Sequence, residues 1–104
     1  MDSTFSEPGG ARLGWLNVTV PFATLSGGRN ALRLSCFDQD YVFDRTSIAR
    51  LSKFRGMFSI GLQILHTLPV YPEFVVFWVS PVPWSSRFAK LKAKLESLGY
   101  EVHD

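Results

Sequence analysis

The stretch Glu73-Phe74-Val75-Val76-Phe77-Trp78-Val79-Ser80 decides the fold of this chain. Its six central residues are all apolar, and they are β-branched or aromatic, which favours a strand. The run is too short to cross a membrane as a helix, and it lacks the alternation of a half-buried strand. It therefore predicts a strand covered on both faces, ended by Pro81 and Pro83, because proline donates no ladder hydrogen bond.

An amphipathic helix is expected to follow from about Ser85 and to cover one face of the sheet. Its apolar residues recur at spacings of three, four and three: Phe88, Leu91, Leu95 and Leu98. Ser85 or Ser86 suits the first position of such a helix. Gly99 suits the left-handed residue after its end, with Tyr100 then contacting the last turn.

The residues before the decisive stretch read as further strands. Alternating apolar side chains predict strands near residues 16–22, 32–36, 41–43 and 58–66. Short polar connections make the first three an antiparallel meander, and the fourth is expected to form a hairpin with residues 73–80. Residues 46–56 fit either a strand with a bulge or a short helix, and we favour the strand.

The length of 104 residues, with 46% hydrophobic and 19% charged residues, is typical of one globular domain. Residues 1–12 are polar and contain Pro8-Gly9-Gly10, so they are expected to form a flexible tail before a domain at 13–104. The fold class is mainly β (α+β). We expect a strongly bent antiparallel sheet or small barrel of about six strands with one C-terminal amphipathic helix.

Charge and targeting signals restrict the function only weakly. The net charge of +2 is too small to indicate a polyanion partner, although residues 45–104 carry the basic excess. The first residues have neither the basic nor the apolar region of a signal peptide, so a cytoplasmic protein is expected. Arg55-Gly56-Met57-Phe58 begins like an RNA-binding strand motif, but the pattern stops there and disfavours nucleic acid.

No constellation of catalytic or metal-binding residues is evident, so no enzyme, metal or cofactor is expected. A single cysteine, Cys36, excludes an intramolecular disulfide and falls on the apolar face of its strand. His66 and His103 are far apart in sequence, and His66 is expected as a satisfied histidine at the edge of the core. The acids near the third strand are typical of turns: Asp38, Asp40 and Asp44.

The order of elements resembles the pleckstrin-homology and GRAM-type fold. The resemblance spans about Leu13 to Val102 and rests on these segments: Gly14-Trp15, Tyr41-Val42-Phe43-Asp44-Arg45, 59–66, 74–78 and a helix ending at Gly99-Tyr100. It implies a bent sheet closed by the helix and a binding role, since many family members bind proteins or peptides. Two features depart from the family: six strands are counted where it has seven, and few basic residues lie near the first hairpin. A lipid headgroup is therefore not implied.

Two kinds of residue form the candidate partner surface. Basic side chains come from residues 50–55 and from the helix, and tryptophans flank the strands: Arg50, Lys53, Arg55, Arg87, Lys90, Lys94, Trp15 and Trp84. The basic residues are suited to an acidic partner or a membrane surface, and the alternative is an ordinary solvated face. Exposed tryptophan is frequent at binding hot spots, but it also plugs helix ends.

Three functional hypotheses follow. The first is a non-catalytic cytoplasmic domain that binds another protein, with a homodimer through a sheet edge as a further possibility. The second is a small-ligand carrier or minimal enzyme that uses an aromatic interior, with His66 as the acid–base group. The third is a peripheral binder of anionic membranes through the basic residues.

Overall fold

The decisive stretch forms strand β7 (Val75–Ser80), in the interior of a single curled sheet. The computed structural model describes residues 4–56, 59–80 and 86–104, and within them it contains eight strands and one α-helix. Val75, Val76 and Phe77 expose no surface to solvent. The predicted strand with both faces covered is therefore confirmed.

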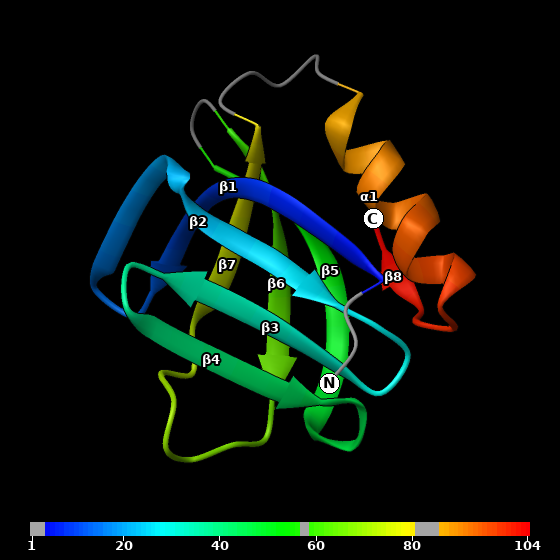
Figure 1. Cartoon of the computed structure of the whole chain (residues 1–104), viewed down its shortest axis with the longest axis horizontal. Coiled ribbons are helices and arrows are strands. Elements are labelled where there is room, and N and C mark those ends of the chain that lie inside the picture. Colours follow the sequence, from blue (N-terminus) through cyan, green and yellow to red (C-terminus); the bar gives the residue numbers. More distant parts are fainter. Residues whose placement is uncertain (1–3, 57–58, 81–85) are drawn as a thin grey trace.

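The sheet consists of two groups of strands. The first is β1 (Phe5–Leu13), β2 (Leu16–Gly27), β3 (Ala31–Cys36) and β4 (Gln39–Asp44). The second is β5 (Ile48–Arg55), β6 (Ile60–His66) and β7. The strand order is β4-β3-β2-β1-β7-β6-β5-β8, because β1 pairs with both β2 and β7. The two groups cross, and helix α1 (Arg87–Ser97) lies at one side of them (Figure 1).

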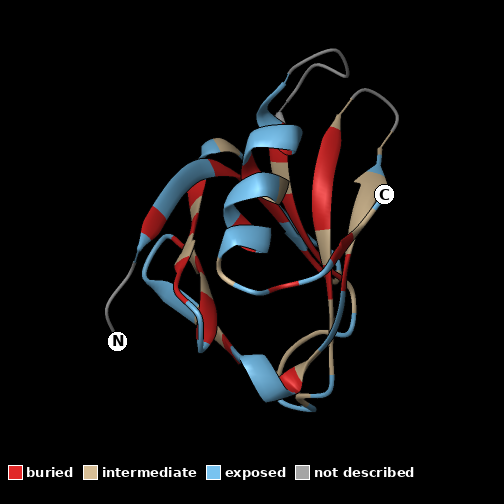
Figure 2. Cartoon of the chain, turned by 90° about the vertical axis from the view of Figure 1, so that its right-hand side faces the viewer, coloured by how far each residue is buried: buried red, intermediate tan, exposed pale blue. Residues whose placement is uncertain are grey.

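The core lies between the crossed groups and beneath α1. Figure 2 shows buried segments on the strands and on the helix side that faces them. The largest fully buried side chains come from both groups of strands and from α1, and they include Phe43, Phe77, Leu25, Leu34, Leu62 and Leu95. No helix in the described residues is long and apolar enough to cross a membrane.

Several predicted pairings are confirmed. Strands β2, β3 and β4 form the antiparallel meander, and β6 pairs with β7 as an antiparallel hairpin. Residues 48–55 are a strand with a register shift between Ile48 and Arg50, as favoured for this segment. A 3₁₀ turn at Arg45–Ser47 leads into it.

Strand β1 occupies most of the segment that was expected to be a flexible tail. The described part of the chain therefore has eight strands rather than about six, and the first of the two missed strands is β1. Pro8-Gly9-Gly10 favoured the prediction of a flexible tail, but the two glycines allow close packing of β1 against its neighbours. A Cβ atom on Gly9 would clash with the Trp78 backbone oxygen, and one on Gly10 would lie 2.6 Å from the Val18 oxygen.

In strand β2 the residues that point inward have even numbers before a bulge and odd numbers after it. Val18 is opposite Ala11 and Ala23 is opposite Gly9, so residues 19–22 bulge out against a single residue of β1. The bulge shifts the buried positions from even to odd numbers, because side chains alternate strictly along a strand. The alternation that predicts the strand at 16–22 would place Phe22 on the same inward face as Val18, and this implication is wrong, because Phe22 is 61% exposed.

Helix α1 ends as predicted. Phe88, Leu91 and Leu95 are buried, and Gly99 has a φ of 92°. The Tyr100 amide donates a hydrogen bond of 3.1 Å to the Leu95 carbonyl, which closes the last turn. Ser86 is the N-cap residue, although its side chain makes no capping hydrogen bond.

The second missed strand is β8 (Val102–His103), which follows the helix. It pairs in parallel with Leu51 and Ser52 of β5, whereas an antiparallel sheet was expected throughout. Two residues are too few for an alternation pattern to be recognised in the sequence.

Candidate functional site

The residues predicted as a partner surface fall on two sides of the molecule. Trp15 lies in the loop between β1 and β2, at the left of Figure 1, whereas α1 lies at the right. The basic candidates come from β5 and α1: Arg50, Lys53, Arg55, Arg87, Lys90 and Lys94. Trp84 lies outside the described residues. The structure therefore does not bring Trp15 together with the basic residues of α1.

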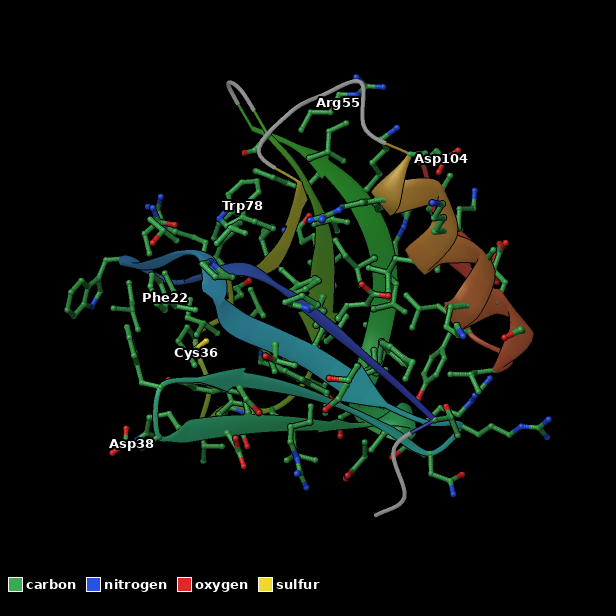
Figure 3. The ribbon with its side chains drawn as sticks, turned by 45° about the horizontal axis from the view of Figure 1, so that its top comes forward. Phe22, Cys36, Asp38, Arg55, Trp78 and Asp104 are labelled. Atoms are coloured by element: carbon green, nitrogen blue, oxygen red, sulfur yellow. The ribbon has the colours of Figure 1, made fainter. Side chains whose placement is uncertain are left out.

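Three exposed aromatic side chains gather on the side that carries Trp15. Trp15 is 88% exposed, Phe37 is 76% exposed and Phe22 is 61% exposed. Figures 1 and 3 place the β1–β2 loop, the β2 bulge and the β3–β4 loop on this same side, with Phe22 labelled in Figure 3. We call Trp15, Phe22 and Phe37 the aromatic end.

Local backbone structure presents these three side chains to solvent. Trp15 and Phe37 each lie in a two-residue loop between paired strands, where side chains project beyond the sheet. Phe22 follows Pro21 in the β2 bulge, and its neighbour Ala23 pairs with Cys36, next to the Phe37 loop. Sequence reasoning identified Trp15 but missed Phe22 and Phe37. The two-residue spacing between the strands was the available signal for Phe37.

Phe37 adopts a backbone conformation that does not suit a phenylalanine. Its φ is 57°, the left-handed region in which glycine is preferred and a side chain costs roughly 1 kcal/mol. Its ring also buries little surface in return, since it is 76% exposed. Folding stability therefore gives no reason for a large aromatic residue at this position.

A cavity of about 500 Å³ opens beside the β2 bulge. Strands β1, β2 and β7 and the segment before β6 line it with Arg12, Asn17, Val18, Thr19, Val20, Ser59 and Trp78. The Trp78 ring also packs edge-on against Phe54, with ring centroids 5.8 Å apart. The cavity thus combines an aromatic wall with one cationic side chain, which is a common composition for a ligand pocket.

On the other side of the molecule, basic residues of β5 and α1 surround one carboxylate. Lys92 Nζ lies 3.0 Å from Asp104 Oδ1. This hydrogen bond, more than the further charges of Lys53 and Arg55, holds the pKa of Asp104 below its usual value. Lys53 also lies over the Phe88 ring, with its Nζ 5.2 Å from the centroid. Two of the predicted basic residues, Lys53 and Arg55, therefore both act on the Asp104 carboxylate.

Arg50 lies apart from this carboxylate and lines a hollow of about 280 Å³ at the C-terminal end of α1. Arg45 also lines the hollow, and its side chain holds the end of the helix in place. Its guanidinium donates hydrogen bonds to the backbone oxygens of Arg29, Leu98 and Gly99 and lies 4.6 Å from the Tyr100 ring centroid. The bonds to Leu98 and Gly99 satisfy carbonyl groups at the end of the helix, and the bond to Arg29 ties that end to the β2–β3 loop.

His66 has both ring nitrogens engaged by the backbone. Nδ1 accepts a hydrogen bond from the Leu68 amide, so Nε2 carries the proton and donates to the Pro72 oxygen, at 2.8 Å. The ring packs on Phe43, with centroids 5.0 Å apart. The expectation of a satisfied histidine at the core edge is confirmed. The 500 Å³ cavity is lined by other residues.

Cys36 is buried as expected, with 2% of its surface exposed. Burial raises the pKa of its thiol, which keeps the group protonated and unreactive near neutral pH. Among the described residues, no group of three or more His, Cys, Asp or Glu side chains is placed to hold a metal ion.

Comparison of the chain with protein-family models, with curated proteins and with solved structures gives no match.

Proposed function

We propose that this protein is a non-catalytic domain that binds another protein through the aromatic end. The observation that carries the proposal is Phe37, an exposed aromatic side chain on a backbone conformation that favours glycine. A residue that costs stability and buries little is typical of a functional site. Trp15 and Phe22 lie on the same side and extend the surface.

The chemistry of the aromatic end suits a protein partner. Each of its three side chains has enough exposed apolar surface to contribute roughly 1.5–3 kcal/mol when a partner buries it. Aromatic residues dominate the energy of protein interfaces because they bury large areas with few rotatable bonds. The hairpin loops that carry two of them are only two residues long, which limits the backbone entropy lost on binding.

The order of the strands supports the proposed likeness to pleckstrin-homology domains. Among the described residues seven strands precede α1 once β1 is counted, which is the number that the family has. The helix then follows the last of these strands and covers one side of the curled sheet (Figure 1). Binding of proteins or peptides is a common role in that family, which agrees with the proposed function.

The cavity beside the β2 bulge favours a second candidate, the binding of a small ligand. Its volume of about 500 Å³ lies within the range of small-molecule sites. Trp78 offers an aromatic surface and Arg12 a positive charge, so an apolar molecule with an acidic group would fit. This candidate differs from the original hypothesis of an interior site, because His66 is outside the cavity.

The test of protein binding compares wild type with Trp15→Ser, Phe22→Ser and Phe37→Gly. Each is used to capture proteins from the native lysate at low and high salt, and a captured protein is then purified for affinity measurements. We expect a partner that is retained at high salt, because apolar contacts are not screened. We expect each substitution to weaken its binding about tenfold or more.

Two controls separate binding from folding. Val70→Ser removes an 81% exposed side chain from the β6–β7 loop and should bind the partner like wild type. Phe37→Gly should unfold at the same temperature as wild type or higher, because glycine relieves the positive φ. The proposal fails if nothing is captured at high salt or if the three variants bind normally. Binding to neutral phospholipid vesicles that the same substitutions abolish would instead assign the aromatic end to a membrane.

A further inference from the structure

A groove lies between β5 and α1, on the side of the molecule away from the aromatic end. Its volume is about 320 Å³. The floor is apolar, with Ile60 and Phe88 each 5% exposed. Lys53 and Lys92 line it together with a single acidic residue of the helix, Glu96. The groove therefore combines an apolar floor with a rim of two lysines and two carboxylates, those of Glu96 and Asp104.

The chain's own Asp104 shows which chemical group the groove accepts. Its carboxylate lines the groove and receives a hydrogen bond from Lys92 Nζ, at 3.0 Å. Lys53 and Arg55 also lie close enough to lower the pKa of this carboxylate. Figure 3 shows Arg55 and Asp104 on the same side of the molecule, beside α1. One cation thus binds this carboxylate and two more act on it electrostatically. The carboxylate is itself mostly exposed, so its ion pair with Lys92 is weak.

The edge of β5 beyond its pairing with β8 has backbone hydrogen-bonding groups without a strand partner among the described residues. Strand β8 pairs with β5 at Leu51 and Ser52, and within the described residues this edge of β5 has no strand partner at residues 53–55. The two backbone groups of a residue point to one side of a strand, and the side alternates along the chain. At least one of these three residues therefore directs its N–H and C=O toward this open edge of the sheet, and one of the three, Lys53, also lines the groove.

We infer that the groove binds an extended acidic segment of a partner protein. The segment continues the line of β8 along residues 53–55 and places a carboxylate at Lys92, where it displaces Asp104. Backbone pairing supplies affinity, and the cations supply the preference for an acidic side chain. The inference rests on the proposed function only in taking the partner to be a protein, since the aromatic end lies on the other side.

The test uses a synthetic capped peptide of about eight alternating Thr and Glu residues and the ¹⁵N-labelled full chain. We expect the amide resonances of residues 53–55 and Asp104 to shift during titration. Lys92→Gln should weaken binding about two- to fivefold, and Asp104→Asn should strengthen it by a similar factor because the competing carboxylate is lost. Both variants should keep the wild-type melting temperature within a few degrees, since these side chains are partly or mostly exposed.

Matched controls separate site binding from general charge attraction. Lys94→Gln removes the same charge from an exposed position of α1 outside the groove lining and should leave the affinity unchanged. A Thr-Lys peptide should not bind, and an N-methylated Thr-Glu peptide should bind much more weakly because it cannot pair with β5. The inference is overturned if no peptide binding is seen, if Lys94→Gln and Lys92→Gln have equal effects, or if N-methylation has no effect. Preferential binding of phosphatidylserine vesicles through Lys53 and Lys92 would also overturn it, in favour of a membrane.

These outcomes are distinguishable from those for the aromatic end. Trp15→Ser and Phe22→Ser should leave peptide binding in the groove unchanged, whereas Lys92→Gln should leave the salt-resistant partner bound. A failure of either proposal therefore leaves the other standing.

Discussion

Tyr100 illustrates how a single side chain joins distant parts of the chain. Its hydroxyl donates a hydrogen bond of 2.7 Å to the Gly28 backbone oxygen, and its ring lies against the Arg45 guanidinium. Burial raises the pKa of the phenol, and the charge of Arg45 opposes this in part. The protonated phenol is therefore the form that the folded state favours.

We predict that Tyr100→Phe lowers the free energy of unfolding by about 1–2 kcal/mol at pH 7, because the buried Gly28 oxygen loses its donor. The contribution of the phenol is fully present below its unfolded-state pKa, about 10, and is lost as pH rises through the raised folded-state pKa. Urea unfolding between pH 7 and 11 should therefore show a shallower alkaline decline for the variant. An identical decline in both proteins would mean that Tyr100 does not titrate with unfolding.

For individual residues, the sequence predicted which side chains are buried better than it predicted which aromatic side chains are exposed. Cys36 and His66 behave as expected, because their positions in alternating strands determine their surroundings. Phe22 and Phe37 could not be recognised as exposed, since the β2 bulge and the hairpin loop that expose them leave only weak signals in the sequence. No structural role was predicted for Arg45, which belonged to the segment Tyr41–Arg45 of the family resemblance. Its role depends on carbonyl groups that are 16 to 54 positions away in sequence.

Helix α1 is the element for which the sequence was most informative, and it allows a sharp prediction. Leu91 is 3% exposed in the middle of its buried face. Leu91→Asp would place an unpaired carboxylate in the core, which costs more than about 4 kcal/mol and so most of the stability of a small domain. Thermal unfolding followed by circular dichroism should show no cooperative transition for this variant.

Ala93→Asp is the control for Leu91→Asp, because it adds the same side chain to an exposed position of the same helix. It should change the free energy of unfolding by less than about 1 kcal/mol, through helix propensity alone. A wild-type transition in Leu91→Asp, or equal losses in the two variants, would show that α1 does not cover the core.

The strands differ in how well the sequence predicts them, and the reason is physical. Buried residues recur at every second position in β3 (Leu32, Leu34 and Cys36) and in β6 (Ile60, Leu62 and Ile64), so period two identifies both strands. Strand β1 escaped detection because its polar residues and Pro8-Gly9-Gly10 are typical of a flexible tail, whereas the missing side chains of Gly9 and Gly10 permit contact with β7 and β2. Strand β2 was found, but its four-residue bulge moved the inward positions by one and inverted the prediction for Phe22.

At the scale of the molecule, the sheet depends on β1 because it is the strand between the two groups. Its residues pair with β2 on one side, and Gly10 to Leu13 pair with β7 on the other. Phe5, Ala11 and Leu13 also belong to the core, each less than 9% exposed. The relative position of the two candidate surfaces also depends on β1, because the aromatic end lies on the first group of strands and the groove lies beside the second.

We therefore predict that a chain of residues 13–104, the domain expected from the sequence, does not fold. Removing residues 1–12 deletes Phe5 and Ala11 from the core and exposes unpaired edges on both β2 and β7. The lost packing alone is roughly 2–4 kcal/mol, to which the lost strand pairing adds, against a total of about 5–15 kcal/mol. The shortened chain should give a poorly dispersed amide spectrum and no cooperative thermal transition. A dispersed spectrum with the wild-type melting temperature would show that β2 and β7 are held in place without β1, and the tail boundary at residue 12 would then stand.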